Sequence, residues 1–503
     1  MKKRLVKLTT LAIIASMSIS MFSGCSSKAK ETSNDASADS KVTNLSVMLP
    51  SFNTDVLADN SPVKVKLEEL TKTKLTFNWV PSTSYADKLN ITLASGQLPN
   101  ILYVPEKSSS ILSGVKAGAF WEIGPLLKDY KNLSQIDKDV LWNTAINGKY
   151  YALYRSRPFG RNGITYRKDW LANVGLQEPK TIDDFYNMVK AFTNNDPDKN
   201  GKNDTYGLAA SKTNMQFAMS LPWFGAPNKW GADESGKLAP DFTFSGYKDA
   251  LKFWKKLYSE KLINQDFAVF EPTKVADLFN NGKVGTLIDV ADAAQRADEG
   301  MVKADPSKAN AVDVIGAVEG PDGLRNLPTS GYAGMFLFPK SSNKTEADLK
   351  KVIKFMDAIN NKEEQVLINN GIENLTFKLD KGFTSKMSPA PALTLNTGLG
   401  QLGTAIPENY SYLPVQTPVR IKVVKVIEEN KKTAVTNPTE PYVSKTYTTK
   451  GAQLDNIIED ARVKFIVGQI DEKGFDAAIA TWKKSGGDDV ITEYNEQAKL
   501  YKK

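Results

Sequence analysis

The chain of 503 residues is too long for one ordinary hydrophobic core, so its length predicts two or three domains or lobes. Its 41% hydrophobic and 24% charged residues are typical of a soluble globular protein. The formal net charge is +8, but four basic residues lie in the first 24, which contain no acid; the remainder has 61 basic and 57 acidic residues, or +4. This small surplus, with no dense basic block interleaved with aromatic residues, argues against a nucleic-acid partner.

Two features of the composition limit the chemistry. The chain contains no histidine, which excludes the commonest general base, the Ser-His-Asp arrangement and His-containing zinc sites. It contains one cysteine, which excludes an internal disulfide and a thiolate cluster. Carboxylate chemistry and metal binding through oxygen ligands remain possible.

The first 24 residues have the three parts of an export signal. A basic start is followed by an apolar run over 8–22, which is shorter than the ~20 residues of a comfortable membrane span. Ser23 and Gly24 then precede Cys25, an order that resembles the bacterial lipobox, although Phe22 stands where that motif usually has leucine. The resemblance implies that residues 1–24 are a signal peptide and that Cys25 becomes the lipidated first residue. An ordinary signal peptide with an incidental cysteine is the alternative.

Residues 25–42 are predicted to form the lipidated cysteine and a flexible tether. The stretch after Cys25 has almost no apolar content and cannot bury a core; as a random coil it would reach roughly 20–25 Å. Two or more acyl chains give a stable anchor, since each buried methylene contributes ~0.8 kcal/mol. We therefore expect an extracytoplasmic protein, anchored to the outer face of the cell membrane by an N-terminal lipid, with no transmembrane helix in the rest of the chain.

The folded part opens with an alternation of strands and helices. Apolar residues alternate over 45–49 and 75–79, a helical pattern follows Pro62, another covers 85–93, and a short apolar run spans 101–104. This order predicts βαβ units in a doubly wound α/β sheet. Further helices are expected at 182–192, capped by Thr181, and at 247–258 and 349–359, with buried strands at 284–290 and 333–338.

Seven sequence blocks resemble the extracellular solute-binding proteins of the maltose-binding type, solute-binding family 1. They occur in order over roughly 43–380: LASGQLPNILYV (93–104), NGKYYALYRSRP (147–158), GITYRKDWLANVGLQEPKTIDDF (163–185), DPDKNGKNDTYGL (196–208), FNNGKVGTLIDV (279–290), SGYAGMFLFPKSS (330–342) and NKEEQVLINNGIENLTFKL (361–379).

The resemblance implies a two-lobed, periplasmic-binding-protein-like (type 2) fold. Each lobe would be a doubly wound α/β sheet, and a hinge would let the lobes close on a ligand between them. The lobe boundaries that we expect are 43–158 for the first part of lobe 1, 159–328 for lobe 2, 329–378 for the return to lobe 1, and 379–503 mainly for lobe 2 and C-terminal helices.

The segment 196–204 matches the first nine positions of an EF-hand loop, with oxygen side chains at alternate positions and Gly201 at the sharp turn. Position 12 is Gly207, so the bidentate glutamate of a true EF-hand is missing. The family resemblance implies a structural Ca²⁺ here, although Thr205 stands where an acid is often found. A plain polar turn is the alternative. The predicted ligands are the side chains of Asp196, Asp198, Asn200 and Asp204 and the backbone carbonyl of Lys202.

Sugar sites need flat aromatic rings and planar polar groups. We therefore expect the ligand-binding residues in aromatic loops and at the ends of strands. The loop 221–230 holds two tryptophans, which could form a cleft platform or a local plug. Arg155, with Arg157 and Arg161 nearby, could bind hydroxyls or an acidic group, or form salt bridges between the lobes. A core role is the alternative for Trp79. The residues that we predict to line the cleft are Asn53, Trp79, Arg155, Trp223, Trp230, Asp289, Tyr332 and Glu373.

These features favour the substrate-binding lipoprotein of an ABC importer. It would act as a monomer without catalysis, capture a carbohydrate such as an oligosaccharide, and deliver it to a membrane permease. An extracellular carbohydrate-active enzyme that uses two carboxylates is one alternative. A sensor-coupled or structural surface lipoprotein is the other.

Overall fold

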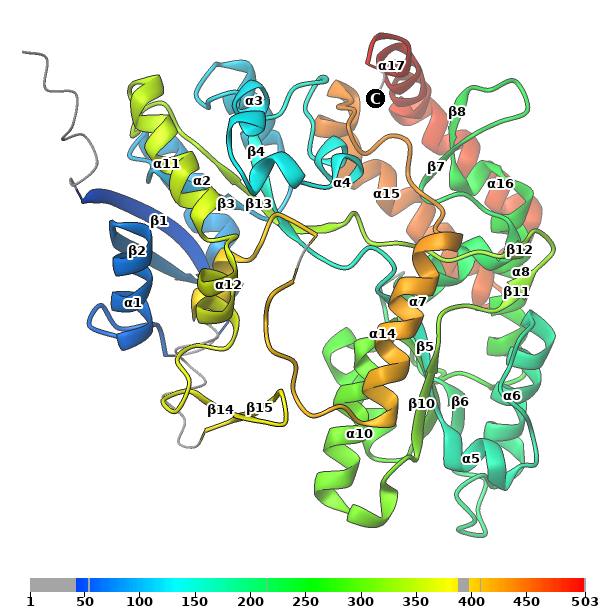
Figure 1. Cartoon of the computed structure of the whole chain (residues 1–503). Coiled ribbons are helices and arrows are strands. Elements are labelled where there is room, and N and C mark those ends of the chain that lie inside the picture. Colours follow the sequence, from blue (N-terminus) through cyan, green and yellow to red (C-terminus); the bar gives the residue numbers. More distant parts are fainter. Residues whose placement is uncertain (1–41, 53–54, 214, 388–397, 408, 502–503) are drawn as a thin grey trace, which may run out of the picture. The chain divides into compact units, whose positions relative to one another are not determined.

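The computed structural model describes residues 42–52, 55–213, 215–387, 398–407 and 409–501, and assigns Val42–Lys503 to one compact unit (Figure 1). The predicted signal peptide, Cys25, the tether up to residue 41, and Asn53 lie outside the described residues. No helix within the described ranges is long and apolar enough to span a membrane.

The first sheet has five strands in the order β2-β1-β3-β13-β4. Strand β1 pairs in parallel with β2 and β3, whereas β13 is antiparallel to both β3 and β4. The predicted strand-helix alternation is confirmed, because the alternating apolar side chains of β1 are buried in one core with those of α1. The bounds are β1 Thr43–Ser51, α1 Pro62–Thr71, β2 Thr73–Pro81, α2 Tyr85–Ser95, β3 Ile101–Val104, β4 Ala152–Ser156 and β13 Tyr332–Leu337.

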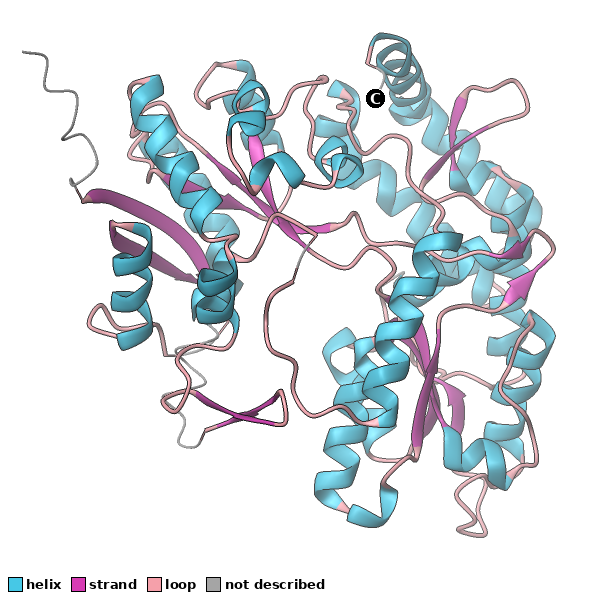
Figure 2. Ribbon diagram, viewed as in Figure 1, coloured by secondary structure: helices cyan, strands magenta, loops and turns pink. Residues whose placement is uncertain are grey.

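The second sheet has four strands in the order β10-β5-β9-β6. Its helix α6 begins as predicted: the Thr181 hydroxyl accepts a hydrogen bond from the Asp184 backbone N–H at 3.1 Å, and Asp184 accepts one from the Thr181 N–H. Figure 2 shows helices on both sides of this sheet, α10 and α14 on one and α6 on the other. The bounds are β5 Asn162–Arg167, α6 Ile182–Asn194, β6 Tyr206–Leu208, β9 Val284–Val290, α10 Asp292–Ala304, β10 Val312–Ile315 and α14 Pro418–Asn430.

The remaining elements complete two α/β lobes, which agrees with the predicted fold class. The last three helices share a core with the second sheet, whereas Leu399, Leu402 and Ala405 belong to the core of the first sheet. The other bounds are α3 Ser109–Lys116, α4 Lys138–Asn143, α5 Lys168–Asn173, α7 Met215–Ser220, β7 Trp230–Ala232, β8 Leu238–Pro240, α8 Ser245–Ser259, α9 Val275–Asn280, β11 Glu319–Gly320, β12 Gly323–Leu324, α11 Glu346–Ala358, α12 Lys362–Asn369, β14 Phe377–Asp380, β15 Phe383–Lys386, α15 Lys445–Ile466, α16 Glu472–Trp482 and α17 Asp488–Leu500.

Candidate functional site

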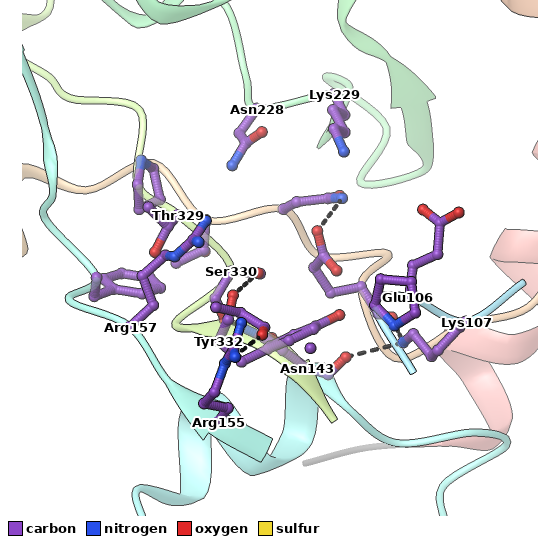
Figure 3. A pocket seen from close by; sticks show the side chains of 18 of the residues that line it. Glu106, Lys107, Asn143, Arg155, Arg157, Asn228, Lys229, Thr329, Ser330 and Tyr332 are labelled. Carbon is purple, nitrogen blue, oxygen red and sulfur yellow. Dashed lines mark hydrogen bonds between the residues drawn. The ribbon is translucent and has the colours of Figure 1, made fainter. Parts of the chain in front are cut away.

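A pocket of about 600 Å³ is lined by residues that come from both lobes and from the segment before α15 (Figure 3). The first sheet contributes the residues at and just beyond the ends of β3, β4 and β13, and the loop before β7 contributes the facing wall. Loops beyond strand ends are the usual place for ligands in open α/β sheets. The polar lining residues are Tyr103, Glu106, Lys107, Asn143, Arg155, Arg157, Asn228, Lys229, Thr329, Ser330, Tyr332, Thr436, Asn437 and Glu440.

A bulge in β13 fixes Arg155 in the pocket wall. The register of β13 against β4 shifts between Tyr332 and Met335, and this turns the Ala333 carbonyl toward two donors. That carbonyl accepts hydrogen bonds from Arg155 Nε at 2.9 Å and from the Tyr103 hydroxyl at 3.0 Å. Glycine is required at 334, since φ is +90° and a Cβ would lie 2.3 Å from the Tyr103 oxygen. The Arg155 guanidinium also lies 5.0 Å from the centre of the Tyr103 ring.

Arg157 lies two residues further along and is held differently. Its backbone N–H donates to the Gly331 carbonyl at 2.9 Å, but its guanidinium has no hydrogen bond or ion pair among the described residues. Burial lowers the pKa of Arg157, and the positive charges of Arg161 and Arg155 lower it further. Arg161, in contrast, forms a two-pronged ion pair with Asp292 at 2.8 and 2.9 Å.

Lys107 connects the first lobe to the segment before α15. Its ammonium donates to the carbonyls of Asn143 at 2.9 Å and Ala145 at 3.3 Å, and to the carbonyl of Glu440. Burial lowers the pKa of Lys107 to about 8, and the Glu440 carboxylate opposes this shift. The three carbonyls satisfy the three donors of the ammonium group without neutralising its charge.

The pocket lining is positively charged. It contains four cationic side chains, those of Lys107, Arg155, Arg157 and Lys229, and two carboxylates, those of Glu106 and Glu440, which gives a formal charge of +4 − 2 = +2. None of these six groups forms a salt bridge with another described residue. A narrow site with unneutralised positive charge attracts anions.

A second pocket of about 430 Å³ adjoins the first, with which it shares Glu106, Lys107, Lys229, Asn437 and Glu440. Its wall is aromatic: Trp230 packs edge-on against Tyr494 with ring centres 4.8 Å apart. The two pockets therefore form a continuous polar and aromatic surface.

The structure brings three of the predicted cleft residues to these pockets. Arg155 and Tyr332 line the first pocket, and Trp230 lines the second. Trp79 packs against Phe77, with ring centres 5.2 Å apart, beside a cavity of only about 10 Å³. That space is large enough for one water molecule at most, so it holds no sugar.

Three other predicted residues lie away from both pockets, and the prediction for Trp223 is corrected. Trp223 is 2% exposed and packs edge-on against Phe185, with ring centres 5.4 Å apart, so it belongs to the second core. Asp289 is at the end of β9, where it accepts a hydrogen bond from the Val290 N–H, and it lines neither pocket. Glu373 is exposed after α12 and also lies outside both linings.

Sequence reasoning missed several lining residues. Lys107 follows the end of β3, so the strand-end rule that selected Asp289 could have found it. Asn228 and Lys229 lie within the aromatic loop 221–230, from which only Trp223 and Trp230 were predicted to line the cleft. No local pattern distinguishes Glu440, which reaches the pocket only through the packing of the C-terminal segment.

The predicted calcium loop follows α6 and is held by its own side chains. The Asp196 carboxylate accepts from the N–H groups of Asn200 at 3.0 Å and Gly201 at 2.9 Å. The Asn200 amide donates to Asp198 at 2.9 Å and to Asp204 at 3.1 Å. The side chains of Asp196, Asp198, Asn200 and Asp204 thus take part in hydrogen bonds within one turn.

The loop fits a calcium ion in part. The oxygen ligand types are those that Ca²⁺ prefers, but no group of three acidic, histidine or cysteine side chains within the described ranges is placed to hold a metal ion. Asp204 instead forms a salt bridge with Lys283 at 2.9 Å, and the Thr205 hydroxyl donates to the buried Phe192 carbonyl at 2.7 Å. Gly207 could not be replaced by glutamate, because a Cβ there would lie 2.0 Å from the Val189 carbonyl oxygen.

Comparison with known proteins identifies the family. The sequence model described as "Bacterial extracellular solute-binding protein" matches residues 54–366. The chain belongs to this family. It is 47% identical to lipoprotein LipO of Bacillus subtilis (strain 168) over 490 residues, 96% of each chain. It is 38% identical to the polygalacturonan/rhamnogalacturonan-binding protein YtcQ of the same strain, over 87% of this chain and 88% of YtcQ.

A solved structure supports the fold at lower identity. The EF-hand mutant of the ABC-transporter substrate-binding protein FusA from S. pneumoniae, in complex with fructo-nystose, aligns with a TM-score of 0.66 at 18% identity. The alignment covers 90% of this chain and 98% of FusA. This likeness shows that the chain shares its overall fold with a solved substrate-binding protein.

Proposed function

We propose that this protein is the substrate-binding lipoprotein of an ABC importer, which captures an oligosaccharide and delivers it to a membrane permease. The observation that carries the proposal is the pocket of about 600 Å³ to which both lobes contribute. Membership of the solute-binding family supports it, as do the sugar ligands in the names of YtcQ and FusA.

The lining suits a sugar. Asn143, Asn228 and Asn437 offer planar amides that can both donate to and accept from hydroxyl groups. Tyr332 in the first pocket and Trp230 in the second offer rings for the apolar faces of sugar units. Because the two pockets share a wall, a chain of several units fits this surface better than a single sugar.

Capture would involve closure of the two lobes. We propose the lobe boundaries expected from the sequence, 43–158 with 329–378 for lobe 1 and 159–328 with most of 379–503 for lobe 2. Closure around a ligand would then bring Asn228 and Lys229 of lobe 2 against the strand ends of lobe 1. We also propose that the protein is a monomer held to the membrane by lipidated Cys25.

A structural calcium ion is part of the proposal. Asp196, Asp198, Asn200, Asp204 and the Lys202 carbonyl would hold it, and it would brace the connection between α6 and β6. Calcium should raise the melting temperature and a chelator should lower it. Asp198→Asn should abolish this response, whereas the matched control Asp233→Asn, in another turn built on an exposed carboxylate, should retain it. A calcium response that Asp198→Asn leaves intact would place any ion elsewhere.

The function is tested by calorimetric titration of the purified protein with a panel of oligosaccharides, followed by chromatography of the mixture. We expect saturable binding of an intact oligosaccharide. Release of shorter sugars would favour the carbohydrate-active enzyme. Saturable binding together with normal uptake of the sugar by a strain that lacks the permease would favour the sensor-coupled or structural lipoprotein.

A further inference from the structure

We infer that the pocket selects acidic oligosaccharides and that Arg157 binds the carboxylate of a uronic acid unit. This inference rests on the proposed function, because it specifies the sugar class that the same pocket takes. Its starting point is the excess positive charge of the lining, in which no lining cation forms a salt bridge with a described residue.

The lack of ion pairs at Arg155 and Arg157 is unusual within this molecule. Of the six other arginines in the described part of the chain, five have a carboxylate within ion-pair distance, and the buried Arg462 has none. The five are Arg161 and Arg296 with Asp292, Arg167 with Asp169, Arg325 with Asp322, and Arg420 with Glu299. The fold therefore supplies carboxylates to most arginines elsewhere, and of the three described arginines without one only Arg155 and Arg157 line the pocket.

Arg157 is the pocket cation best placed to bind a ligand directly. Arg155 already donates to three neutral acceptors, the Ala333 carbonyl, Gln401 and the Tyr103 hydroxyl, so it contributes mainly its charge. The Arg157 guanidinium has all its donors available, and its backbone is fixed by Gly331. A planar guanidinium can hold a carboxylate through two parallel hydrogen bonds.

The surroundings of Arg157 favour an anion over a neutral hydroxyl. Arg155 and Arg161 both add positive potential at Arg157, and Asp292, the carboxylate that opposes this effect, is already shared by Arg161 and Arg296. A bound carboxylate would relieve this repulsion, whereas a hydroxyl group would not. The gain is larger in a partly desolvated pocket than in open water.

The two sides of the pocket also differ in charge, which gives the ligand a direction. Arg155 and Arg157 form no ion pair with a described residue, whereas Lys107 lines the pocket together with the carboxylates Glu106 and Glu440. Figure 3 shows Arg157 on the left of the pocket and Glu106 with Lys107 on the right, with Asn228 and Lys229 above. The Arg157 side therefore attracts a carboxylate more strongly than the Glu106 side does, so we expect one uronate carboxylate at Arg157 and hydroxyl groups of the ligand facing Glu106.

Lys229 strengthens this selection from the opposite wall. It has a left-handed backbone with φ of 58°, held by a hydrogen bond from the Asp241 N–H to its carbonyl at 2.7 Å. The Lys229 ammonium interacts electrostatically with the carboxyl groups of Asp241 and Asp455. Lys229 should therefore contribute less than Arg157 to the affinity for an anionic ligand.

The test uses two ligands that differ at one carbon of each unit. Calorimetric titration compares α-1,4-linked trigalacturonate with α-1,4-linked galactotriose, in which hydroxymethyl groups replace the carboxylates. The proteins are the wild type, Arg157→Gln, and the control Lys237→Gln, which removes one positive charge from the exposed turn of the β7–β8 hairpin, outside both pockets.

We expect the wild type to bind trigalacturonate at least about tenfold more tightly than galactotriose. Arg157→Gln should weaken trigalacturonate binding by about tenfold to a hundredfold and change galactotriose binding by less than about threefold. Lys237→Gln should leave both affinities unchanged.

Each other outcome overturns the inference. Equal binding of the two ligands, or tighter binding of galactotriose, would leave the proposed function standing and exclude acid selection. An equal loss of trigalacturonate affinity in Arg157→Gln and Lys237→Gln would mean that binding depends only on the overall charge of the protein. Binding of neither ligand, with no other oligosaccharide bound, would overturn the proposed function as well.

Discussion

Two arginines ten residues apart, Arg157 and Arg167, differ in the partners that the fold provides for their charge. Arg157 lies in the pocket wall without a hydrogen bond or ion pair to its guanidinium in the described part of the chain. Arg167, at the end of β5, is 5% exposed, pairs with Asp169 at 2.7 and 2.5 Å, and lies 4.7 Å from the centre of the Trp170 ring.

The two arginines have different roles: the paired Arg167 stabilises the fold, whereas the unpaired Arg157 is available to a ligand. At Arg167 the carboxylate and the packed ring offset the cost of burying the charge, since an unpaired buried charge is strongly destabilising. A half-exposed arginine in a pocket can remain unpaired because water solvates it until a ligand arrives. The hydrogen-bonding of a charged residue is therefore a better indicator of a binding role than its residue type.

The largest expected effect is at Arg167. Arg167→Gln should lower the free energy of unfolding by about 3 kcal/mol, because it removes the two hydrogen bonds to Asp169, leaves that carboxylate only the longer ion pair with Lys308 at 3.9 Å, and removes the contact with Trp170. Arg157→Gln should change it by less than about 0.5 kcal/mol. Urea denaturation of both variants measures the difference, and equal losses would contradict the distinction between the two regions.

Gly403 supports the pocket and should have the next largest effect. A Cβ at this position would lie 2.1 Å from Arg155 Cγ, and φ is +60°. Gly403→Ala should therefore displace Arg155, lower the free energy of unfolding by about 2 kcal/mol, and weaken ligand binding.

Gly96→Ala is the matched control for this prediction. Gly96 has a similar φ of +70° with a ψ of −4°, whereas ψ is −169° at Gly403, and a Cβ at Gly96 would meet no atom within 4 Å. Gly96→Ala should lower the free energy of unfolding by only about 1 kcal/mol, because of the backbone conformation alone, and should leave ligand binding unchanged. If the two variants lose the same amount, the packing of Gly403 against Arg155 has no energetic importance.

Lys107 gives a smaller, pH-dependent effect. Its pKa of about 8 in the folded protein lies below the ordinary value near 10.5, so between these values the unfolded chain binds a proton that the folded protein has released. Stability should therefore rise with pH from about 8 to about 10, by at most about 1.4 kcal/mol per pH unit from this group. Below pH 8 the buried Lys107 ammonium is charged, so its burial lowers the free energy of unfolding by the full amount.

Denaturation at several pH values tests this. Lys107→Met should lack the rise, whereas Lys116→Met, which alters an exposed lysine of α3, should keep it. An identical pH profile for Lys107→Met and the wild type would show that the ammonium group is not perturbed by burial.

The smallest effect is expected at Lys283, which pairs with Asp204 on the surface. Lys283→Gln should shift the melting temperature by less than about 2 °C without calcium, because exposed ion pairs contribute little. It should increase the stabilisation by calcium relative to the wild type, since Asp204 is released to act as a ligand. A weaker response to calcium in this variant than in Lys237→Gln would count against the proposed site.

The sequence predicted the framework more reliably than the pocket. Strand β1 and helix α6 follow from the apolar alternation over 45–49 and from Thr181 with Asp184, which are local signals. The prediction for Trp223 failed because an aromatic loop has the same composition whether its rings face a cleft or fill a core. Glu440 and Lys107 meet across 333 residues of sequence, a contact that depends on tertiary packing alone.

A crystal structure of the protein with trigalacturonate would show whether the unpaired arginine serves the ligand. We predict that the sugar lies in the pocket between β4 and the loop before β7, with one carboxylate bonded to the Arg157 guanidinium and hydroxyl groups facing Glu106. A trigalacturonate bound outside this pocket, or inside it with no carboxylate on Arg157, would contradict the assignment of Arg157 to the ligand.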